Sequence, residues 1–438
     1  MVQQPITNLD SPEYAVPNPN LIPTVDYPSQ MMSIPPSRMF TIKTALSVYK
    51  QKAGADAPTY DASQGDGGAS LPGVSHHYLE RALELQLEHG TGYDKPFGTE
   101  LFRQATAEQY WKFSAESGFG PENIIFTQGG RDALNKAYDA MITLGHGRKG
   151  DLLVVSRVPW ISYNWGPYSV GLNVLRAPGQ PAEGWKYTPE GIRTCVEFAE
   201  RENRKIAGIV ITSPDNPTGR TIPVAEQVEL ARTALDAGIP FVLFDWIYHW
   251  VTEGSPNDIN EVLEAFSPED RERLMFLDGL TKSLGASNIR SAHLVAGKAV
   301  IKYINSQASH GVIPSFFAQA VALATYEEGF DKAAAYVAKP TAQSRHLLRA
   351  ALDAENANYI MGDGYYAFID VSDAIAAGGL QDSQSLGSVL AEDFGVAVVP
   401  GVFFSQAGAS WVRFSYAQPP ERTEKAIAQF FKGIQSFG

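Results

Sequence analysis

Short apolar segments that alternate with amphipathic helical segments constrain the fold of this chain most strongly. The apolar segments are rich in β-branched residues and occupy residues 123–127, 151–156, 205–212 and 240–245. Helix-like segments lie between them, for example residues 130–141 and 223–238. Strands that are apolar on both faces and separated by helices are typical of a largely parallel sheet covered on both sides. The sequence therefore predicts an α/β fold whose ligands bind at the carboxyl ends of the strands.

Two further regions flank this alternating part. Residues 1 to about 40 are rich in Pro, Ser and Asn and show no sustained period, which predicts an extended arm. After about residue 310, helical stretches are followed by two short apolar runs and Gly-rich turns, which suits a smaller α+β domain. The predicted division is an arm with part of a small domain at 1–75, a large domain at 76–310 and a C-terminal small domain at 311–438.

Composition excludes several classes of protein. The chain has 35 Lys and Arg against 48 Asp and Glu, a net charge of −13, so no nucleic-acid partner is expected. No segment is apolar and long enough to span a bilayer, so no membrane role is expected either. The single cysteine, Cys195, excludes an intrachain disulfide framework, and the first twenty residues do not resemble a secretory signal. These features favour a cytoplasmic protein.

Most familiar catalytic motifs are absent. The chain contains no GxGxxG, GxxxxGK[ST], GxSxG or HExxH sequence, which leaves no support for a dinucleotide fold, a P-loop, an α/β-hydrolase or a zincin. Its eight histidines form no recognisable ligand cluster, so no metal site is expected. The chemistry must therefore be sought among the polar residues that follow the predicted strands.

Two loops after predicted strands carry glycine or asparagine. Gly129 and Gly130 permit a tight turn directly before a helix, where backbone N–H groups would face an anion. Asn216 lies in a loop, residues 213–220, that two prolines and a glycine make rigid. Each loop taken alone is equally consistent with an ordinary turn.

Two later segments carry ionisable side chains. Asp245 ends an apolar strand, with Tyr248 three residues later, and a carboxylate there needs a cation or donor unless it is simply a helix N-cap. Lys282 and Arg290 lie eight residues apart. An enclosed lysine can form a Schiff base and a nearby arginine can bind a phosphate, although a lone lysine is more often a solvated surface residue.

In their joint order these residues resemble the signature of the pyridoxal-phosphate-dependent class I/II aminotransferases, the aspartate-aminotransferase superfamily. The matching motifs are NPTG from Asn216, D-x-x-Y from Asp245 and K-x7-R from Lys282, within a resemblance that runs from about Asp61 to Arg413. The resemblance implies fold type I, with a mostly parallel seven-stranded sheet in the large domain and a smaller α+β domain. It also implies pyridoxal 5'-phosphate as cofactor and a homodimer with shared active sites.

The resemblance further implies a role for each matching residue. Lys282 would hold the cofactor as an internal aldimine and move the α-proton, and Asp245 would pair with the pyridine nitrogen. Asn216 and Tyr248 would hydrogen-bond the ring hydroxyl oxygen, and Trp160 would stack on the ring. The cofactor phosphate would lie near Gly129, Gly130, Arg131, Thr281 and Arg290, with Tyr93 reaching the phosphate of the neighbouring subunit.

The resemblance leaves the substrate open. Arg413 would receive the α-carboxylate of an amino acid, in a pocket that Gly65 and Asn216 also line. Several positions depart from the family pattern: Gly67, Gly68 and Ala69 replace Pro-Asp-Phe, Gly279 replaces a serine, and Asn288 and Ala292 replace glycines. These departures preserve the cofactor chemistry but favour an uncharged or unusually large substrate over a common amino acid.

The leading hypothesis is an aminotransferase that acts on an α-amino acid through an external aldimine and an α-carbanion. The alternatives use the same carbanion in a β- or γ-eliminating lyase, a decarboxylating or oxidising enzyme, or a synthase of specialised metabolism. A third class, a non-catalytic ligand sensor, is disfavoured because Lys282 is retained and no DNA-binding extension is evident.

Overall fold

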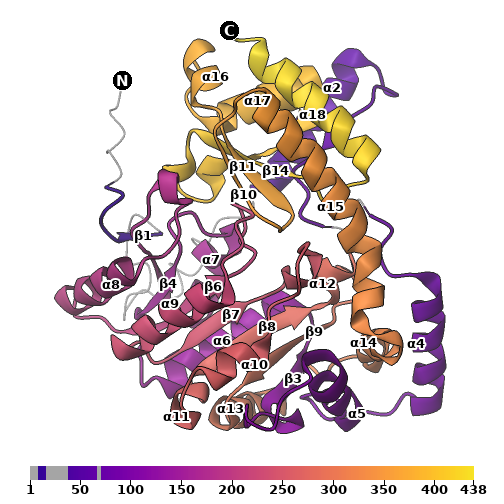
Figure 1. The fold of residues 1–438 in the computed structure, drawn as a ribbon, viewed down its shortest axis with the longest axis vertical. Helices are drawn as coiled ribbons and strands as arrows, with labels where there is room; N and C mark the ends of the chain where they lie inside the picture. The colour runs from indigo at the N-terminus through magenta and orange to yellow at the C-terminus, as the bar shows by residue number, and fades with distance from the viewer. Residues whose placement is uncertain (1–7, 16–37, 67–70) are drawn as a thin grey trace.

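The computed structural model of the chain describes residues 8–15, 38–66 and 71–438, and Figure 1 shows how its elements are arranged. An eight-stranded sheet has the order β1-β5-β4-β6-β7-β8-β9-β3. Its strands are β1 (Glu13–Tyr14), β3 (Ile124–Thr127), β4 (Leu152–Val155), β5 (Asn173–Arg176), β6 (Ile206–Thr212), β7 (Val242–Asp245), β8 (Leu274–Gly279) and β9 (Ala292–Ala296). The central strands from β5 to β8 pair in parallel, β9 runs antiparallel to both neighbours, and β1 runs antiparallel to β5.

The predicted α/β fold with a mostly parallel sheet is confirmed. The sheet has one strand more than the predicted seven, because Glu13–Tyr14 from the predicted arm pairs with the edge strand β5. The other arm residues, 1–7 and 16–37, lie outside the described part of the chain, and so do residues 67–70 with the Gly-Gly-Ala departure at 67–69.

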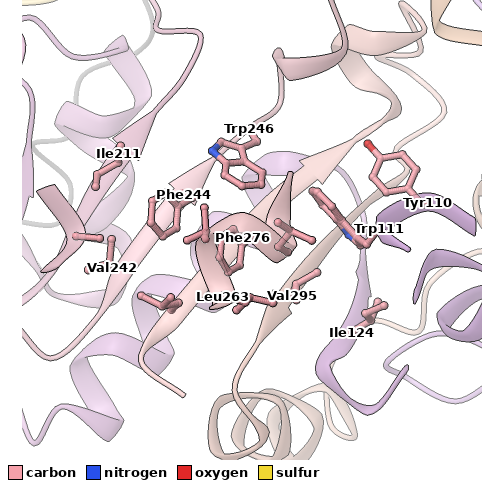
Figure 2. Packing of buried hydrophobic residues seen from close by; sticks show 14 of the residues in the cluster. Tyr110, Trp111, Ile124, Ile211, Val242, Phe244, Trp246, Leu263, Phe276 and Val295 are labelled. Carbon is pink, nitrogen blue, oxygen red and sulfur yellow. The ribbon is translucent and has the colours of Figure 1, made fainter. Parts of the chain in front are cut away.

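Successive residues of the buried strands point to opposite faces of the sheet, and helices cover both faces. Val242 and Phe244 belong to the core cluster on one face, and Leu243 belongs to the cluster on the other. Figure 2 shows Phe244 beside Phe276, whose rings stack with centroids 4.9 Å apart. The first face is covered chiefly by α5 (Glu100–Ala105), α8 (Pro189–Arg201), α9 (Val224–Asp236), α10 (Ile259–Glu264) and α14 (Phe316–Glu328), and the second by α6 (Gly130–Leu144), α7 (Ile161–Trp165) and α13 (Lys298–Ala308).

The helices expected before the first strand form only in part as regular α-helices. The segment from His76 becomes α4 (His76–His89), as its periodicity predicts. The second segment forms α5 and then widens into the π-helical turn η1 (Thr106–Trp111), which a left-handed Lys112 with φ of 51° ends. The π-helical turn carries Tyr110 and Trp111, which both hydrogen-bond buried partners on β8 and β9.

A second, smaller sheet lies above the first in Figure 1 and is antiparallel throughout. Its order is β10 (Tyr359–Met361), β11 (Tyr366–Asp370), β14 (Trp411–Ser415) and β13 (Val399–Pro400). It packs with α2 (Met39–Ala53), the far part of α15 (Phe330–Ala354), α16 (Ser372–Ala377), α17 (Ser383–Phe394), α18 (Pro420–Gln435) and the short pair β2 (Tyr60–Asp61) and β12 (Val396–Ala397).

Helix α15 runs from the large sheet to the small one (Figure 1), while α14 packs its buried side chains into the core of the large sheet. The domain boundaries at residues 75 and 310 stay predictions. Within the described residues, no helix combines the length and the hydropathy that a membrane crossing requires.

Candidate active site

A cavity of about 430 Å³ lies at the carboxyl edge of the large sheet, where β6, β7 and β8 end. Most of the residues singled out from the sequence line it: Gly65, Gly130, Arg131, Trp160, Asn216, Asp245, Tyr248, Thr281, Lys282, Arg290 and Arg413. Gly129 does not line the cavity but lies against the guanidinium of Arg290, which does, and Tyr93 lies away from the cavity on the surface. Residues that come from far apart in the chain thus meet around one space, as the parallel topology predicts.

The Lys282 side chain reaches into this cavity from α12 (Leu280–Ser283), the short helix that follows β8. Its Nζ donates a hydrogen bond to the Gly65 carbonyl and lies 5.8 Å from the centre of the Tyr248 ring. Removal from solvent lowers the pKa of Lys282, and the nearby Arg413 and Arg131 act in the same direction. The amine is therefore easier to deprotonate than an ordinary lysine.

Asp245 ends β7 at the floor of the cavity. Its Oδ2 accepts a hydrogen bond of 2.5 Å from the Tyr163 hydroxyl, and its Oδ1 accepts one of 3.2 Å from the Ile247 backbone N–H. Burial raises the pKa of Asp245 to about 6 despite these donors. Tyr163 was missed at the sequence level, although it follows Trp160 by three residues in the same aromatic segment.

A chain of polar contacts joins the two sheets across the cavity. The Arg413 Nη1 donates to Asn216 Oδ1 at 2.7 Å, and Asn216 Nδ2 lies 3.5 Å from the Tyr248 hydroxyl. The Tyr248 hydroxyl is 2.9 Å from that of Tyr366, whose ring centre lies 4.1 Å from the Arg413 guanidinium carbon. A side chain at Gly65 would place its Cβ 2.1 Å from the Tyr366 hydroxyl oxygen, so this position requires glycine.

Tyr366 is the second site residue that sequence reasoning missed. It lies in the run YYAFIDV, which predicts a strand and gives no signal for a polar role. Its position in the site follows from the pairing of β11 with β14, the strand that carries Arg413.

The opposite end of the cavity is cationic. Arg290 donates from Nη1 to the Ser287 carbonyl at 2.7 Å and from Nη2 to the Gln128 carbonyl at 3.1 Å. Gly129 has φ of 86°, and a Cβ there would lie 2.3 Å from Arg290 Nη2. Helix α6 begins at Gly130, so its first backbone N–H groups lack helical acceptors at this end. These donors suit an anion with several oxygens.

Two departures from the family pattern lie opposite each other on paired strands. A Cβ at Gly279 would lie 2.5 Å from the Ala292 Cβ, because β8 and β9 pair at these residues. It would also lie 2.6 Å from the Ala292 Cα and 2.7 Å from the Ser291 carbonyl oxygen, so the backbone of β9 itself leaves no room for a side chain at 279.

Comparison with known proteins agrees with this arrangement. The family described as aminotransferase class I and II matches residues 63–430, a range that contains every residue lining the cavity. The aspartate/prephenate aminotransferase of Thermus thermophilus is 29% identical over 363 residues, which cover 81% of this chain and 86% of that protein. The aromatic-amino-acid aminotransferase 2 of Thermococcus litoralis is 24% identical over 363 residues, covering 82% and 87%.

Solved structures give the same result for the fold. A double mutant of the Thermus thermophilus aspartate aminotransferase superposes with a TM-score of 0.76 at 26% sequence identity, covering 92% of this chain and 98% of that one. The family match and the structural likeness each extend over both sheets. The chain therefore belongs to the class I and II aminotransferases, a family of pyridoxal-phosphate-dependent enzymes with fold type I.

Proposed function

We propose that this pyridoxal-phosphate-dependent aminotransferase moves the amino group of an α-amino acid within the cavity at the carboxyl edge, with Lys282 as its reactive amine. The observation that supports this most directly is the convergence of one amine, one buried carboxylate and one guanidinium, those of Lys282, Asp245 and Arg413, on a single cavity. These are the three kinds of group that such a reaction needs: a base, a partner for the ring nitrogen and a carboxylate receptor.

The lining residues fit the cofactor at both ends. Arg290 and the backbone N–H groups at Gly130 would hold the phosphate, and the absence of a side chain at Gly129 leaves room for the Arg290 guanidinium. Asp245 would hold a proton on the ring nitrogen at the other end. When bound, pyridoxal phosphate withdraws electrons from the substrate Cα and so makes its proton acidic.

Side chains of this protein would perform the proton transfer. Because burial lowers the pKa of Lys282, its amine loses its proton more readily and would take the Cα proton as a base. Tyr248 and Asn216 would hydrogen-bond the ring oxygen, and Tyr366 holds the Tyr248 hydroxyl in place at 2.9 Å. Trp160 and Thr281, which also line the cavity, would contact the ring face and the phosphate.

Arg413 is the proposed receptor for the substrate α-carboxylate. Its Nη groups bond Asn216 and the Ser63 carbonyl, and its Nε has no hydrogen-bond partner within the described residues. Apolar side chains, those of Leu134, Ile161 and Ile247, line other parts of the cavity and favour an uncharged substrate side chain. The two relatives above are named for aspartate, prephenate and aromatic amino acids, so the family leaves the side chain open.

A homodimer with shared active sites is part of the same proposal. Tyr93 is 95% exposed and lies outside the cavity of its own chain, so a role at a phosphate requires a second subunit. Leu83, Leu87 and Leu101 on α4 and α5 are 53%, 74% and 56% exposed, as is common where chains associate. Light scattering of the holoenzyme should give the mass of a dimer, and Leu87→Asp should shift it toward monomer.

A cytoplasmic location is also proposed. The single cysteine, Cys195, is buried in α8, and burial raises the pKa of its thiol to about 12, which makes it unreactive. A chain without disulfides does not need an oxidising compartment to fold, which suits a reducing one. Fractionation of cells that produce the tagged chain would test the location.

The reaction is tested by its products. The holoenzyme is incubated with a panel of amino acids and a 2-oxo acid acceptor, and each accepted donor should yield its 2-oxo acid and one equivalent of the new amino acid. A lyase would release ammonia without an acceptor, a decarboxylase would release carbon dioxide, and an oxidase would consume oxygen. Any of those outcomes in place of balanced amino transfer would overturn the assignment.

A further inference from the structure

A buried polar cluster that does not line the cavity lies between the elements that carry Lys282 and Tyr248. Its centre is Asp278, the second-last residue of β8, four residues before Lys282. Asp278 is fully buried, and its Oδ1 accepts a hydrogen bond of 2.6 Å from the Gly279 backbone N–H. Its Oδ2 accepts a hydrogen bond from the Tyr110 hydroxyl and lies 2.5 Å from His249 Nε2.

His249 gives this cluster a direct connection to the active site, because it follows Tyr248 in the chain. Its ring packs against the rings of Trp111 and Trp246, with centroid distances of 5.6 Å to each and interplanar angles of 30° and 28°. His249 Nδ1 has no hydrogen-bond partner within the described residues, so the contact of Nε2 with Asp278 is the ring's polar anchor. The ring is thereby held in one orientation.

Tyr110 is the third residue that contacts the Asp278 carboxylate. Its hydroxyl donates to Asp278 and accepts a hydrogen bond of 2.7 Å from Trp250 Nε1. Figure 2 shows Tyr110 and Trp111 together at the end of the core nearest η1, the π-helical turn. The Asp278 carboxylate therefore joins η1, the end of β8 and the 3₁₀ turn η5 (His249–Val251) in a region that water does not reach.

We propose that Asp278 is a positioning residue for amino transfer: it anchors α12 through Gly279 and the segment of Tyr248 through His249, and so sets the separation between Lys282 and Tyr248. The inference rests on the proposed role of Lys282 as the reactive amine. A carboxylate with three donors in a dry environment holds its partners firmly, because each bond is charge-assisted and no water competes for it. Reacting groups that are misplaced by about 1 Å can lose on the order of 100-fold in rate.

Asp278→Asn tests the proposal, because it keeps the shape of the side chain but removes an acceptor. We expect kcat of the holoenzyme to fall about 10- to 100-fold while KM for the amino acid changes less than about threefold. The visible circular dichroism of the bound cofactor should change as well, since it reports how the site holds the ring. This readout does not depend on turnover.

Asp151→Asn is the matched control. Asp151 is another fully buried carboxylate with two backbone donors, but it precedes β4 at the opposite edge of the sheet. It should lower the melting temperature and leave kcat and the dichroism unchanged. If Asp278→Asn behaves in the same way, Asp278 is purely structural and the proposal is wrong.

Tyr110→Phe removes one donor to Asp278 and keeps the aromatic packing, so it serves if Asp278→Asn does not fold. We expect the same pattern with a smaller fall in kcat, about threefold to tenfold. An unchanged kcat and dichroism in this variant would also overturn the proposal.

Borohydride reduction and peptide mapping separate a failure of the proposed function from a failure of the role of Asp278. A label at a lysine other than Lys282 contradicts the proposed function, whereas a label at Lys282 in wild type and variant with equal kcat contradicts only the role of Asp278.

Discussion

Buried polar groups at the two edges of the large sheet have different surroundings. At the amino edge, the Asp151 carboxylate accepts hydrogen bonds of 2.7 and 2.9 Å from the backbone N–H groups of Arg148 and Lys205. At the carboxyl edge, Asp245 also has two donors, but burial still raises its pKa to about 6. Thr127 Oγ1 and Arg413 Nε, which are buried at the same edge, have no hydrogen-bond partner within the described residues.

This difference indicates which polar groups stabilise the fold and which are available to bind a ligand. Both edges bury their ionisable groups, so burial alone does not mark a functional site. What distinguishes the carboxyl edge is the cavity that its ionisable groups line, which holds a lysine with a lowered pKa and a carboxylate with a raised one. Substitutions at the carboxyl edge should therefore affect the reaction, and those at the amino edge should affect only stability.

The largest expected effect is that of Lys282→Ala. Removing the proposed reactive amine should lower amino transfer on the order of 10⁴-fold, because in the proposed function both the attachment of the cofactor and the proton transfer depend on it. Lys205→Ala, at the amino edge, should leave turnover unchanged, since the Lys205 side chain is exposed. Turnover of both variants and borohydride labelling of the wild type measure this, and a label outside Lys282 would contradict it.

Asp245→Asn should lower kcat about 10²- to 10³-fold with little loss of bound cofactor, because it removes the charge that is proposed to stabilise the protonated ring. Asp151→Asn should instead cost about 1 to 3 kcal/mol of stability and leave kcat unchanged. Equal loss of cofactor and of turnover in Asp245→Asn would make Asp245 a structural cap and remove the difference between the edges.

Burial of Asp245 predicts how the stability of the cofactor-free protein depends on pH. The pKa of Asp245 is raised on folding from 3.8 to about 6, so its stabilising contribution is complete below about pH 4 and is lost as the pH rises through 6. The loss is on the order of 3 kcal/mol. In Asp245→Asn the loss of stability between pH 4 and 7 should be smaller than in the wild type. Part of the loss should remain, because the pKa of Asp215 is also raised. Thermal melts of the cofactor-free proteins at both pH values test this, and identical declines would refute it.

Arg413→Ala should lower kcat/KM for amino acids about 100-fold and leave turnover of simple amines of similar size unchanged. The reason is that only the amino acid carries the carboxylate that the guanidinium would receive. Arg148→Ala, at the amino edge, is the control, since this side chain is 66% exposed. An unchanged ratio of amino-acid to amine turnover in Arg413→Ala would show that the carboxylate binds elsewhere.

The smallest expected effect is that of Tyr93→Phe. Tyr93 lies at neither edge of the sheet of its own chain. Loss of one hydrogen bond to a phosphate should weaken cofactor binding about tenfold, with an unchanged dimer mass. Equilibrium dialysis of the cofactor measures this, and unchanged affinity would place Tyr93 outside the site of the partner.

The sequence by itself predicted the mostly parallel sheet and most of the residues singled out at its carboxyl edge. Strands such as Ile206–Thr212 are apolar on both faces, and Asn216, Asp245 and Lys282 each follow one of them closely. Parallel strands end at one edge, so residues that follow successive strands must meet there. Position relative to a strand is a local property of the chain, so the sequence predicted which residues meet at this edge, whereas their chemical roles came from the resemblance to the aminotransferase family.

Only the tertiary structure decided the partners of these residues. Tyr163, Tyr366 and Asp278 look like parts of ordinary apolar or strand segments, yet they bond residues 82, 118 and 168 positions away along the chain. The close approach of Gly279 to Ala292 and the eighth strand at Glu13–Tyr14 likewise depend on pairing between distant segments. Periodicity reports which face a side chain occupies, but which group meets it there depends on how the two sheets and their helices pack together.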